Sequence, residues 1–194
     1  MTDSTATTLE AFRATGAYLS GHFRLTSGLH SPEYLQCAKV LQYPNHAERF
    51  GKAIRAALPE VEVHVVCSPA MGGLMIGHEV ARAFNVRHIF TERDEHARML
   101  LRRGFAVEAG ERVLIVEDVI TTGGSTREVV ALLRSLGAEV VSAASIVDRS
   151  GGTADVGVPR IALATLHVTA YDPAVCPLCA QGVPVVKPGS RPTA

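Results

Sequence analysis

One stretch constrains the fold more than any other, because residues 113–126 read VLIVEDVITTGGST. The apolar run at 113–117 is typical of a central parallel strand that is buried on both faces. Two acids, Glu117 and Asp118, follow the run, and a turn with two glycines comes next. Ser125 to Glu128 then match a capping box and predict the start of a helix. Strand, glycine-rich turn and helix in this order favour an α/β fold.

The flanking segments alternate in the same way, which predicts one domain over residues 1–194 with a mainly parallel central sheet flanked by helices. We expect strands at 61–67, 86–90, 139–148 and 160–168, and helices at 7–19, 45–58 (with Asn45 as N-cap), 74–84 and 125–136. Two short strands should flank the turn at Ser27 and Gly28. The charged segment 91–105 is expected to be a long mobile loop or an extended hairpin, and the tail from Pro173 to be irregular.

Charge and hydropathy exclude several classes of protein. Lys plus Arg and Asp plus Glu both total 19, so the net charge is zero and no overall basic field exists to hold nucleic acid or an anionic membrane. No secretory signal is visible, and no run of about 18 apolar residues is present to span a membrane. We therefore expect a cytoplasmic protein that binds neither nucleic acid nor membrane.

The turn after the central strand has the composition of an anion site. Gly123 and Gly124 allow close approach of the main chain, and converging N–H groups and the helix dipole favour a phosphate. Carboxylates would repel that phosphate, so Glu117 and Asp118 should face something neutral or cationic beside it. Ribose hydroxyls, or Mg²⁺ carried by a pyrophosphate, meet this requirement. Phosphoribosyl pyrophosphate combines all of these groups.

The same stretch resembles the signature of the type I phosphoribosyltransferases. Further segments resemble the orotate phosphoribosyltransferase family: GHFRLTSGLHSPEYLQ matches its hood, SPAMGGLMIG its pyrophosphate loop, and IVDRSGG its Asp-Arg pair. The resemblance implies the type I fold, with a small hood formed mainly by about residues 1–40 and part of the C-terminal tail. It also implies transfer of the phosphoribosyl group to orotate, with Mg²⁺ carried mainly by the pyrophosphate, in a homodimer.

Residue roles follow from the resemblance. Glu117 and Asp118 would hold the ribose, and Asp118 would also be catalytic because its charge suits a developing sugar cation. The phosphoribosyl pyrophosphate site would comprise Glu117, Asp118, Val119, Ile120, Thr121, Thr122, Gly123, Gly124 and Ser125. Arg149 suits a bidentate pair with the orotate carboxylate, Thr121 would also touch orotate, and Tyr34 would face the base.

Cations should close over the leaving pyrophosphate. The candidates in the charged segment are Arg93, His96, Arg98, Arg102 and Arg103, and we assign Arg98 as catalytic by its position. Relatives usually carry lysine in this loop, and many carry it where this chain has Thr26, Gly72 and Gly73. Binding there is expected to depend on backbone N–H groups.

The cysteines divide into two kinds. Cys37 and Cys67 lie in apolar segments and should be core residues. Cys176 and Cys179 form one CPLC, which offers two of the four ligands that a structural zinc needs. We therefore assign no resident metal ligands and expect reduced thiols, with a metal or a disulfide as the alternatives.

Two other functions share the signature. A purine-base phosphoribosyltransferase would have no use for Arg149 as a carboxylate partner. A regulator that senses phosphoribosyl pyrophosphate would need a basic surface or an added DNA-binding module, which the balanced charge disfavours.

Overall fold

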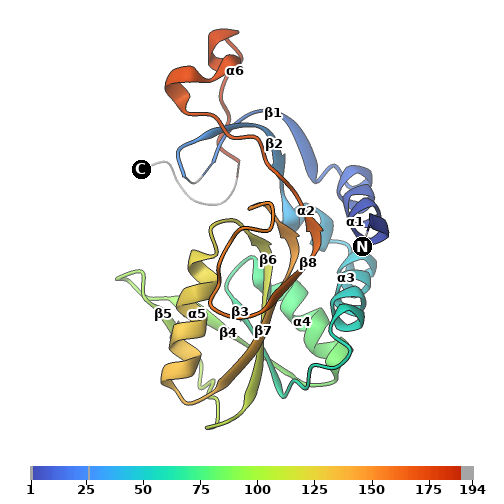
Figure 1. Cartoon of the computed structure of the whole chain (residues 1–194), viewed down its shortest axis with the longest axis vertical. Helices are drawn as coiled ribbons and strands as arrows, with labels where there is room; N and C mark the ends of the chain where they lie inside the picture. The colour runs from blue at the N-terminus through green and yellow to red at the C-terminus, as the bar shows by residue number, and fades with distance from the viewer. Residues whose placement is uncertain (1, 26, 189–194) are drawn as a thin grey trace.

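A six-stranded sheet in the order β5-β4-β3-β6-β7-β8 forms the centre of the protein (Figure 1). The computed structural model describes residues 2–25 and 27–188. All neighbouring strands are parallel except β5, which pairs antiparallel with β4. The strands are β3 (Val65–Pro69), β4 (Arg87–Arg93), β5 (Met99–Leu101), β6 (Arg112–Ile120), β7 (Glu139–Asp148) and β8 (Arg160–Thr165). The predicted fold class, α/β with a mainly parallel sheet, is confirmed.

Helices cover both faces of this sheet. They are α1 (Thr2–Ala14), α2 (Cys37–Leu41), α3 (Pro44–Ala57), α4 (Gly73–Phe84) and α5 (Gly124–Ser135). Leu114 and Val116 of β6 pack in one core with α1 to α4, while Val113 and Ile115 pack in a second core with α5. All four are fully buried, because side chains alternate along a strand and both faces of this one are covered. Burial of β6 on both faces was predicted from its apolar run.

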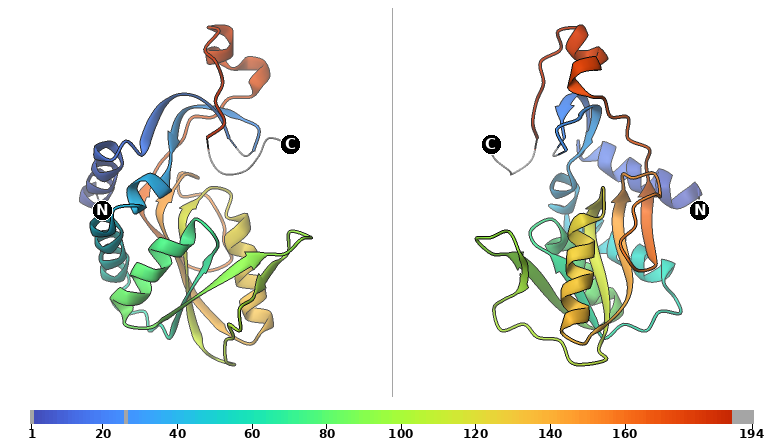
Figure 2. Two further views of the ribbon diagram at one scale, coloured as in Figure 1. Left: turned by 180° about the vertical axis from the view of Figure 1, so that it is seen from behind. Right: turned by 60° about the vertical axis from the view of Figure 1, so that its left-hand side comes forward.

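A small second sheet lies beyond the carboxyl ends of the parallel strands (Figures 1 and 2). It consists of β1 (Tyr18–Arg24) and β2 (His30–Leu35), which pair antiparallel as predicted. The C-terminal tail runs along this hairpin and contains the short helices η1 (Pro173–Val175) and α6 (Pro177–Ala180). We use the term hood for residues 18–35 together with tail residues 171–187. Because α5 begins beneath the hood, the turn that precedes α5 lies between the two sheets.

Several helix boundaries differ from the prediction. The prediction that a capping box begins α5 at Ser125 is wrong. The N-cap is Gly123, which has a left-handed conformation (φ 75°), and no side chain caps the helix. Ser125 therefore lies inside the first turn of the helix instead of preceding it. Asn45 is also not an N-cap, since Pro44 already lies in α3 after Tyr43. The first helix ends earlier than predicted because the chain turns at Gly16 (φ 63°).

Segment 91–105 is an extended hairpin, one of the two predicted forms. Strand β4 continues to Arg93, the chain reverses at residues 94–98, and β5 returns. This hairpin projects from the edge of the sheet in Figure 2. It thus reaches away from the body of its own chain.

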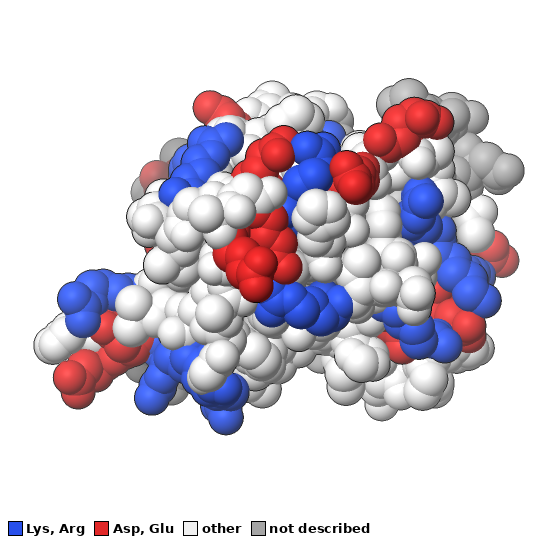
Figure 3. All heavy atoms as spheres, turned by 90° about the horizontal axis from the view of Figure 1, so that it is seen from below, with Lys and Arg blue, Asp and Glu red and all other residues white. Residues whose placement is uncertain are grey.

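Within the described part of the chain, no helix combines the length and the apolar character that a membrane crossing requires. Acidic and basic side chains are interspersed on the face seen in Figure 3, from below in the orientation of Figure 1. This face therefore carries no patch of a single charge.

Candidate active site

The turn between β6 and α5 leaves backbone donors without intrahelical partners. The N–H of Arg127 donates to the carbonyl of Gly123 at 2.9 Å, so the amides of Gly124, Ser125 and Thr126 precede this first helical bond. The guanidinium of Arg127 donates to the carbonyl oxygens of Thr122 (2.9 Å) and Asp155, which braces the turn. An exposed set of amides at a helix N-terminus is suited to an anion.

Glycine is required at position 123. Its φ of +75° is a left-handed conformation, and a Cβ there would lie 2.8 Å from Val156 Cγ1. Gly124 is different, since a Cβ at that position would meet only Thr122 Oγ1, at 3.7 Å. The first glycine therefore shapes the turn, while the second leaves space above it.

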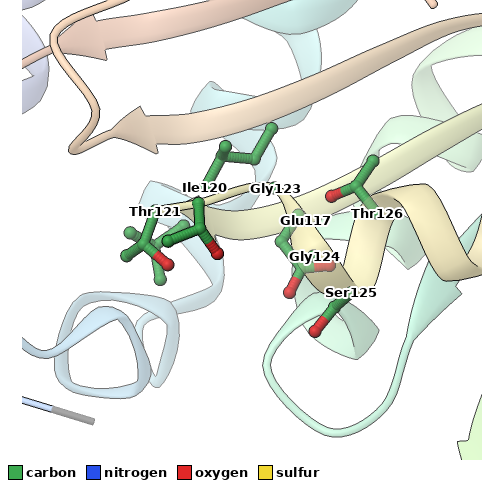
Figure 4. A pocket seen from close by; sticks show the side chains of 9 residues that line it. Glu117, Ile120, Thr121, Gly123, Gly124, Ser125 and Thr126 are labelled. Carbon is green, nitrogen blue, oxygen red and sulfur yellow. The ribbon is translucent and has the colours of Figure 1, made fainter. Parts of the chain in front are cut away.

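A pocket opens over this turn. The pocket is lined by Glu117, Val119, Ile120, Thr121, Thr122, Gly123, Gly124, Ser125 and Thr126. In Figure 4 the Glu117 carboxylate and the Ser125 hydroxyl lie on the same side of the turn, while Ile120 and Thr126 point the other way. The structure thus brings Glu117 together with the predicted phosphate cradle.

Glu117 is a half-buried acid without a full set of partners among the described residues. Its Oε2 is buried and accepts no hydrogen bond from the described residues. Burial, together with the adjacent Asp118 charge, raises the pKa of Glu117 well above its ordinary value, and Arg93 opposes this shift. A carboxylate in this state gains stabilisation from ligand hydroxyls or from a positive charge in the pocket.

Asp118 faces the opposite side of β6. A Cβ on Gly72 would lie 2.6 Å from Asp118 Oδ1, so the loop before α4 is in close contact with this carboxylate. Burial raises the pKa of Asp118, and the bond from the Val119 amide (2.8 Å) opposes the shift. Glycine at position 72 is thus explained: any side chain would collide with the acid.

Arg149 is a half-buried cation with an unpaired donor. Its Nε is buried and has no partner among the described residues, and burial lowers the pKa of the guanidinium. The neighbouring Asp148 cannot neutralise it, because that carboxylate binds Arg160 at 2.7 Å and Ser150 Oγ at 2.6 Å. The Asp-Arg pair therefore separates its roles: the acid holds the loop and the arginine is left available.

Main-chain and ring contacts place Arg149 beside Ile120, which lines the pocket, and next to Tyr34 of the hood. The backbone N–H of Arg149 donates to the carbonyl of Ile120 at 2.8 Å, which sets Arg149 beside Thr121. Its Cζ lies 5.8 Å from the centre of the Tyr34 ring, and Tyr34 packs on Phe23 of β1 at 5.8 Å between ring centres. The two residues predicted to bind orotate and the predicted aromatic face are thus adjacent.

The predicted loop cations do not gather at this pocket within one chain. Arg98 pairs with Asp94 at 2.7 Å, and Arg103 pairs with Glu92 at 2.8 Å, both inside the projecting hairpin. His96 lies 3.5 Å from Glu95 in the same hairpin. Arg93 is nearer the site, because its charge acts to lower the pKa of Glu117 and it pairs with Glu128 of α5 at 2.7 Å. Thr26, expected at a lysine position of the hood, lies outside the described residues.

Sequence reasoning missed two contributors. Cys37 is a core residue as predicted, but its thiol also contacts the carbonyl of Asp118 at 3.8 Å. Arg127 was interpreted only as part of a capping box. Neither role has a local signal, since an arginine in a first helical turn and a cysteine in an apolar segment are ordinary.

An anion cradle beside two half-buried acids at the carboxyl end of a parallel sheet fits the class of proteins that bind a phosphorylated sugar. Residues 39–159, more than half of the chain, match the family model described as "Phosphoribosyl transferase domain".

Known proteins similar to this chain narrow the family further. The chain is 53% identical over 183 residues to an orotate phosphoribosyltransferase of Desulforamulus reducens, covering 94% of this chain and 95% of that protein. It is 55% identical over 180 residues to one of Pelotomaculum thermopropionicum, covering 93% and 94%. The solved orotate phosphoribosyltransferase of Aeropyrum pernix has a TM-score of 0.69 and 26% identity, covering 81% of this chain and 92% of that one. The chain therefore belongs to the orotate phosphoribosyltransferase family.

Proposed function

We propose that this enzyme transfers the phosphoribosyl group of phosphoribosyl pyrophosphate to orotate, giving orotidine 5′-monophosphate and pyrophosphate, a step of UMP biosynthesis. The observation that carries the proposal is the half-buried Arg149, whose Nε has no partner in the described structure. An unpaired guanidinium beside a phosphate cradle needs an anion of its own, and a guanidinium binds a carboxylate in bidentate fashion. Orotate supplies that carboxylate.

The sugar phosphate occupies the turn before α5. Backbone amides of the turn and the first turn of α5, with the hydroxyls of Thr121, Thr122 and Ser125, bind the 5′-phosphate. Glu117 and Asp118 bind the ribose, and their charge stabilises the oxocarbenium-like sugar as the pyrophosphate departs. The two carboxylates lie on opposite faces of β6, so each approaches the ligand from its own side of the strand. Mg²⁺ enters with the pyrophosphate as part of the substrate.

Orotate binds between the hood and β7. Arg149 pairs with its carboxylate, Thr121 contacts it from the turn, and Tyr34 covers the base. This arrangement orients the attacking nitrogen toward the anomeric carbon, and catalysis comes from positioning and electrostatics without a covalent intermediate.

The pyrophosphate lies toward the loop before α4, where Gly72 and Gly73 offer backbone amides. Cations must come from elsewhere, because Arg98 belongs to the hairpin of β4 and β5, which projects from the edge of the sheet (Figure 2), and pairs there with Asp94. We infer a homodimer in the cytoplasm in which the hairpin of one subunit reaches the site of the other and closes over the pyrophosphate.

A panel of bases tests the reaction. Pyrophosphate release is measured with phosphoribosyl pyrophosphate and Mg²⁺ in the presence of orotate, uracil, adenine or hypoxanthine. We expect turnover with orotate and little with uracil, which lacks the carboxylate. Turnover with adenine or hypoxanthine but not with orotate would identify a purine-base enzyme, and no turnover with any base would favour a regulator.

The proposal that the hairpin of one subunit reaches the active site of the other has a separate test. Arg98→Ala should lower kcat about tenfold, as expected for loss of one electrostatic contact in the transition state, while the melting temperature stays unchanged. Arg103→Ala, in the same hairpin, is the matched comparison. Mixing Arg98→Ala with Asp118→Asn subunits should restore activity, because one site of each heterodimer is then intact. Wild-type turnover of Arg98→Ala would assign the role to another cation of the hairpin.

A further inference from the structure

Four side chains of metal-ligating types converge in the hood. They are His22, His30, Cys176 and Cys179, and one ligand atom from each lies within 4.8 Å of the others. His22 Nε2 is 2.8 Å from His30 Nδ1 and 3.6 Å from Cys176 Sγ. Cys179 Sγ lies 3.8 Å from His22 Nε2 and 3.3 Å from His30 Nδ1.

These separations match the edges of a tetrahedral metal site. Zinc binds histidine nitrogen at about 2.0–2.1 Å and cysteine sulfur at about 2.3 Å, which places ligand atoms about 3.3–3.8 Å from one another. Three of the four measured contacts fall in this range, and the histidine pair is closer. A slight separation of the two rings would complete the geometry.

The sequence hides the site because its halves are 146 residues or more apart. His22 and His30 lie on the two strands of the hood hairpin, whereas both cysteines belong to the tail. The tail returns along both edges of the hairpin, through bridges between Tyr171 and His30 and between Val186 and Phe23. The CPLC motif therefore receives its missing ligand pair from the same chain.

The tail around the cysteines has almost no apolar core of its own. From Asp172 to Val186 every residue is exposed except Leu178, which is intermediate, and Cys176, which is 3% exposed. In Figures 1 and 2 this segment projects beyond the hood hairpin. So small a unit needs a disulfide or a metal to hold one conformation, since burial supplies little.

The contacts of His22 prepare it for a metal. Its Nδ1 lies 2.7 Å from the carbonyl of Val183, an acceptor that requires the proton to be on Nδ1. Nε2 then presents its lone pair to the cluster. A hydrogen bond of this kind, from the ring nitrogen that does not bind the metal to a carbonyl oxygen, usually supports a histidine ligand.

We propose that these four residues form a structural Zn²⁺ site that fastens the C-terminal tail to the hood. Two thiolates and two neutral imidazoles in a tetrahedron are the donor set of zinc, and two thiolates balance the charge of the ion in a largely buried position. Four protein ligands leave no open position, so the metal is structural and distinct from the Mg²⁺ of the substrate.

Metal content tests the stoichiometry. The full chain, produced with zinc supplied and kept reduced, should contain about one zinc per chain by mass spectrometry, as a closed four-ligand site requires. Cys179→Ser replaces the exposed thiol and should reduce the bound zinc at least tenfold. Cys67→Ala removes a thiol outside the cluster and should retain the wild-type content. Wild-type protein without stoichiometric zinc, or equal zinc in both variants, would overturn the proposal.

Cobalt identifies the ligands without relying on a variant that folds. Protein stripped with a chelator and loaded with Co²⁺ should show the visible bands of a tetrahedral ion and thiolate-to-cobalt charge transfer. Octahedral bands, or no thiolate transition, would exclude this site.

Hydrogen exchange tests the structural role. Chelation should speed exchange at residues 171–187 at least tenfold, and added Zn²⁺ should reverse the change, while β6 and β7 serve as internal references. Equal rates of hydrogen exchange in the tail with and without zinc would refute the proposal that zinc fastens the tail to the hood. The readout is independent of catalysis, so it stands apart from the proposed reaction.

Discussion

The carboxyl edge of the central sheet and the hood use buried polar groups in opposite ways. At the sheet edge, Glu117 Oε2 and Arg149 Nε are buried and have no partners within the described structure. In the hood, the ring nitrogens of His22 and His30 and the thiols of Cys176 and Cys179 converge on one point. The first arrangement keeps charges apart and available, whereas the second gathers donors around a single centre.

The contrast separates sites for transient ligands from sites that complete the fold. Buried groups without partners cost stability, and the cost is recovered when a substrate supplies the partner. That cost is tolerable at the sheet edge because two large cores flank β6. The tail lacks such a core, so its polar centre must contribute to folding itself.

The largest expected effect at the sheet edge is that of Arg149→Ala. We expect this variant to lose about 2–5 kcal/mol of transition-state stabilisation, measured as a fall in kcat/KM for orotate, because a desolvated charge pair is lost. The KM for phosphoribosyl pyrophosphate and the melting temperature should change little. Arg149→Lys should recover only part of the loss, since lysine cannot form the bidentate pair. An unchanged kcat/KM would show that Arg149 does not bind orotate. Severe unfolding would show that Arg149 stabilises the fold, as the polar groups of the hood are proposed to do.

A glycine pair sharpens the comparison within the turn. Gly123→Ala should lower the free energy of unfolding by about 1–3 kcal/mol, because it forces a left-handed alanine against Val156. Gly124→Ala lies in a helix with open space and should be neutral or slightly stabilising. Chemical denaturation measures both. Equal effects of the two changes would mean that the turn is not shaped as described.

Glu117→Gln should exchange activity for stability. Because the folded pKa of Glu117 is raised, the wild-type protein loses stability as pH rises above the unfolded value, and glutamine removes this loss. We expect about 1 kcal/mol of stabilisation at neutral pH and at least a tenfold fall in kcat/KM, since the charge facing the sugar is gone. Glu95→Gln, at an exposed acid, is the control. A destabilised variant would show that Glu117 already has a partner.

The smallest effect concerns a half-buried histidine, His88, that does have a partner. Burial, with a smaller contribution from His78, lowers the pKa of His88 to about 4, and its Nε2 lies 3.1 Å from Ser68 Oγ. Between about pH 6.5 and 4 the unfolded chain binds more protons, so the free energy of unfolding should fall as the pH is lowered.

His88→Gln should reduce the loss in the free energy of unfolding between about pH 6.5 and 4 by about 1 kcal/mol, after allowance for partial exposure. The difference between the two profiles of stability against pH measures this change. The exposed His96 provides the matched control through His96→Gln. Parallel profiles for wild type and His88→Gln would show that His88 does not titrate in this window.

Local patterns accounted for much of the fold. The apolar run of β6, the alternation of strands and helices and the hood hairpin were all predicted, because periodicity and turn residues report local burial directly. Boundaries were less accurate. The predicted start of α5 was wrong: Ser125 and Glu128 match a capping box, whereas the N-cap is the left-handed Gly123, two residues earlier, whose carbonyl accepts from the N–H of Arg127.

By itself, the sequence determined the class of site: an anion cradle at the end of a buried strand, two adjacent acids and an arginine suited to a carboxylate. Tertiary structure alone decided which groups stay unpaired, since Asp148 is occupied by Arg160 and Ser150 while Arg149 Nε has no partner among the described residues. It also decided that the CPLC of the tail meets two histidines of the hairpin formed by β1 and β2. The physical reason is that convergence of groups distant along the chain depends on packing, which leaves no periodic trace in the residues themselves.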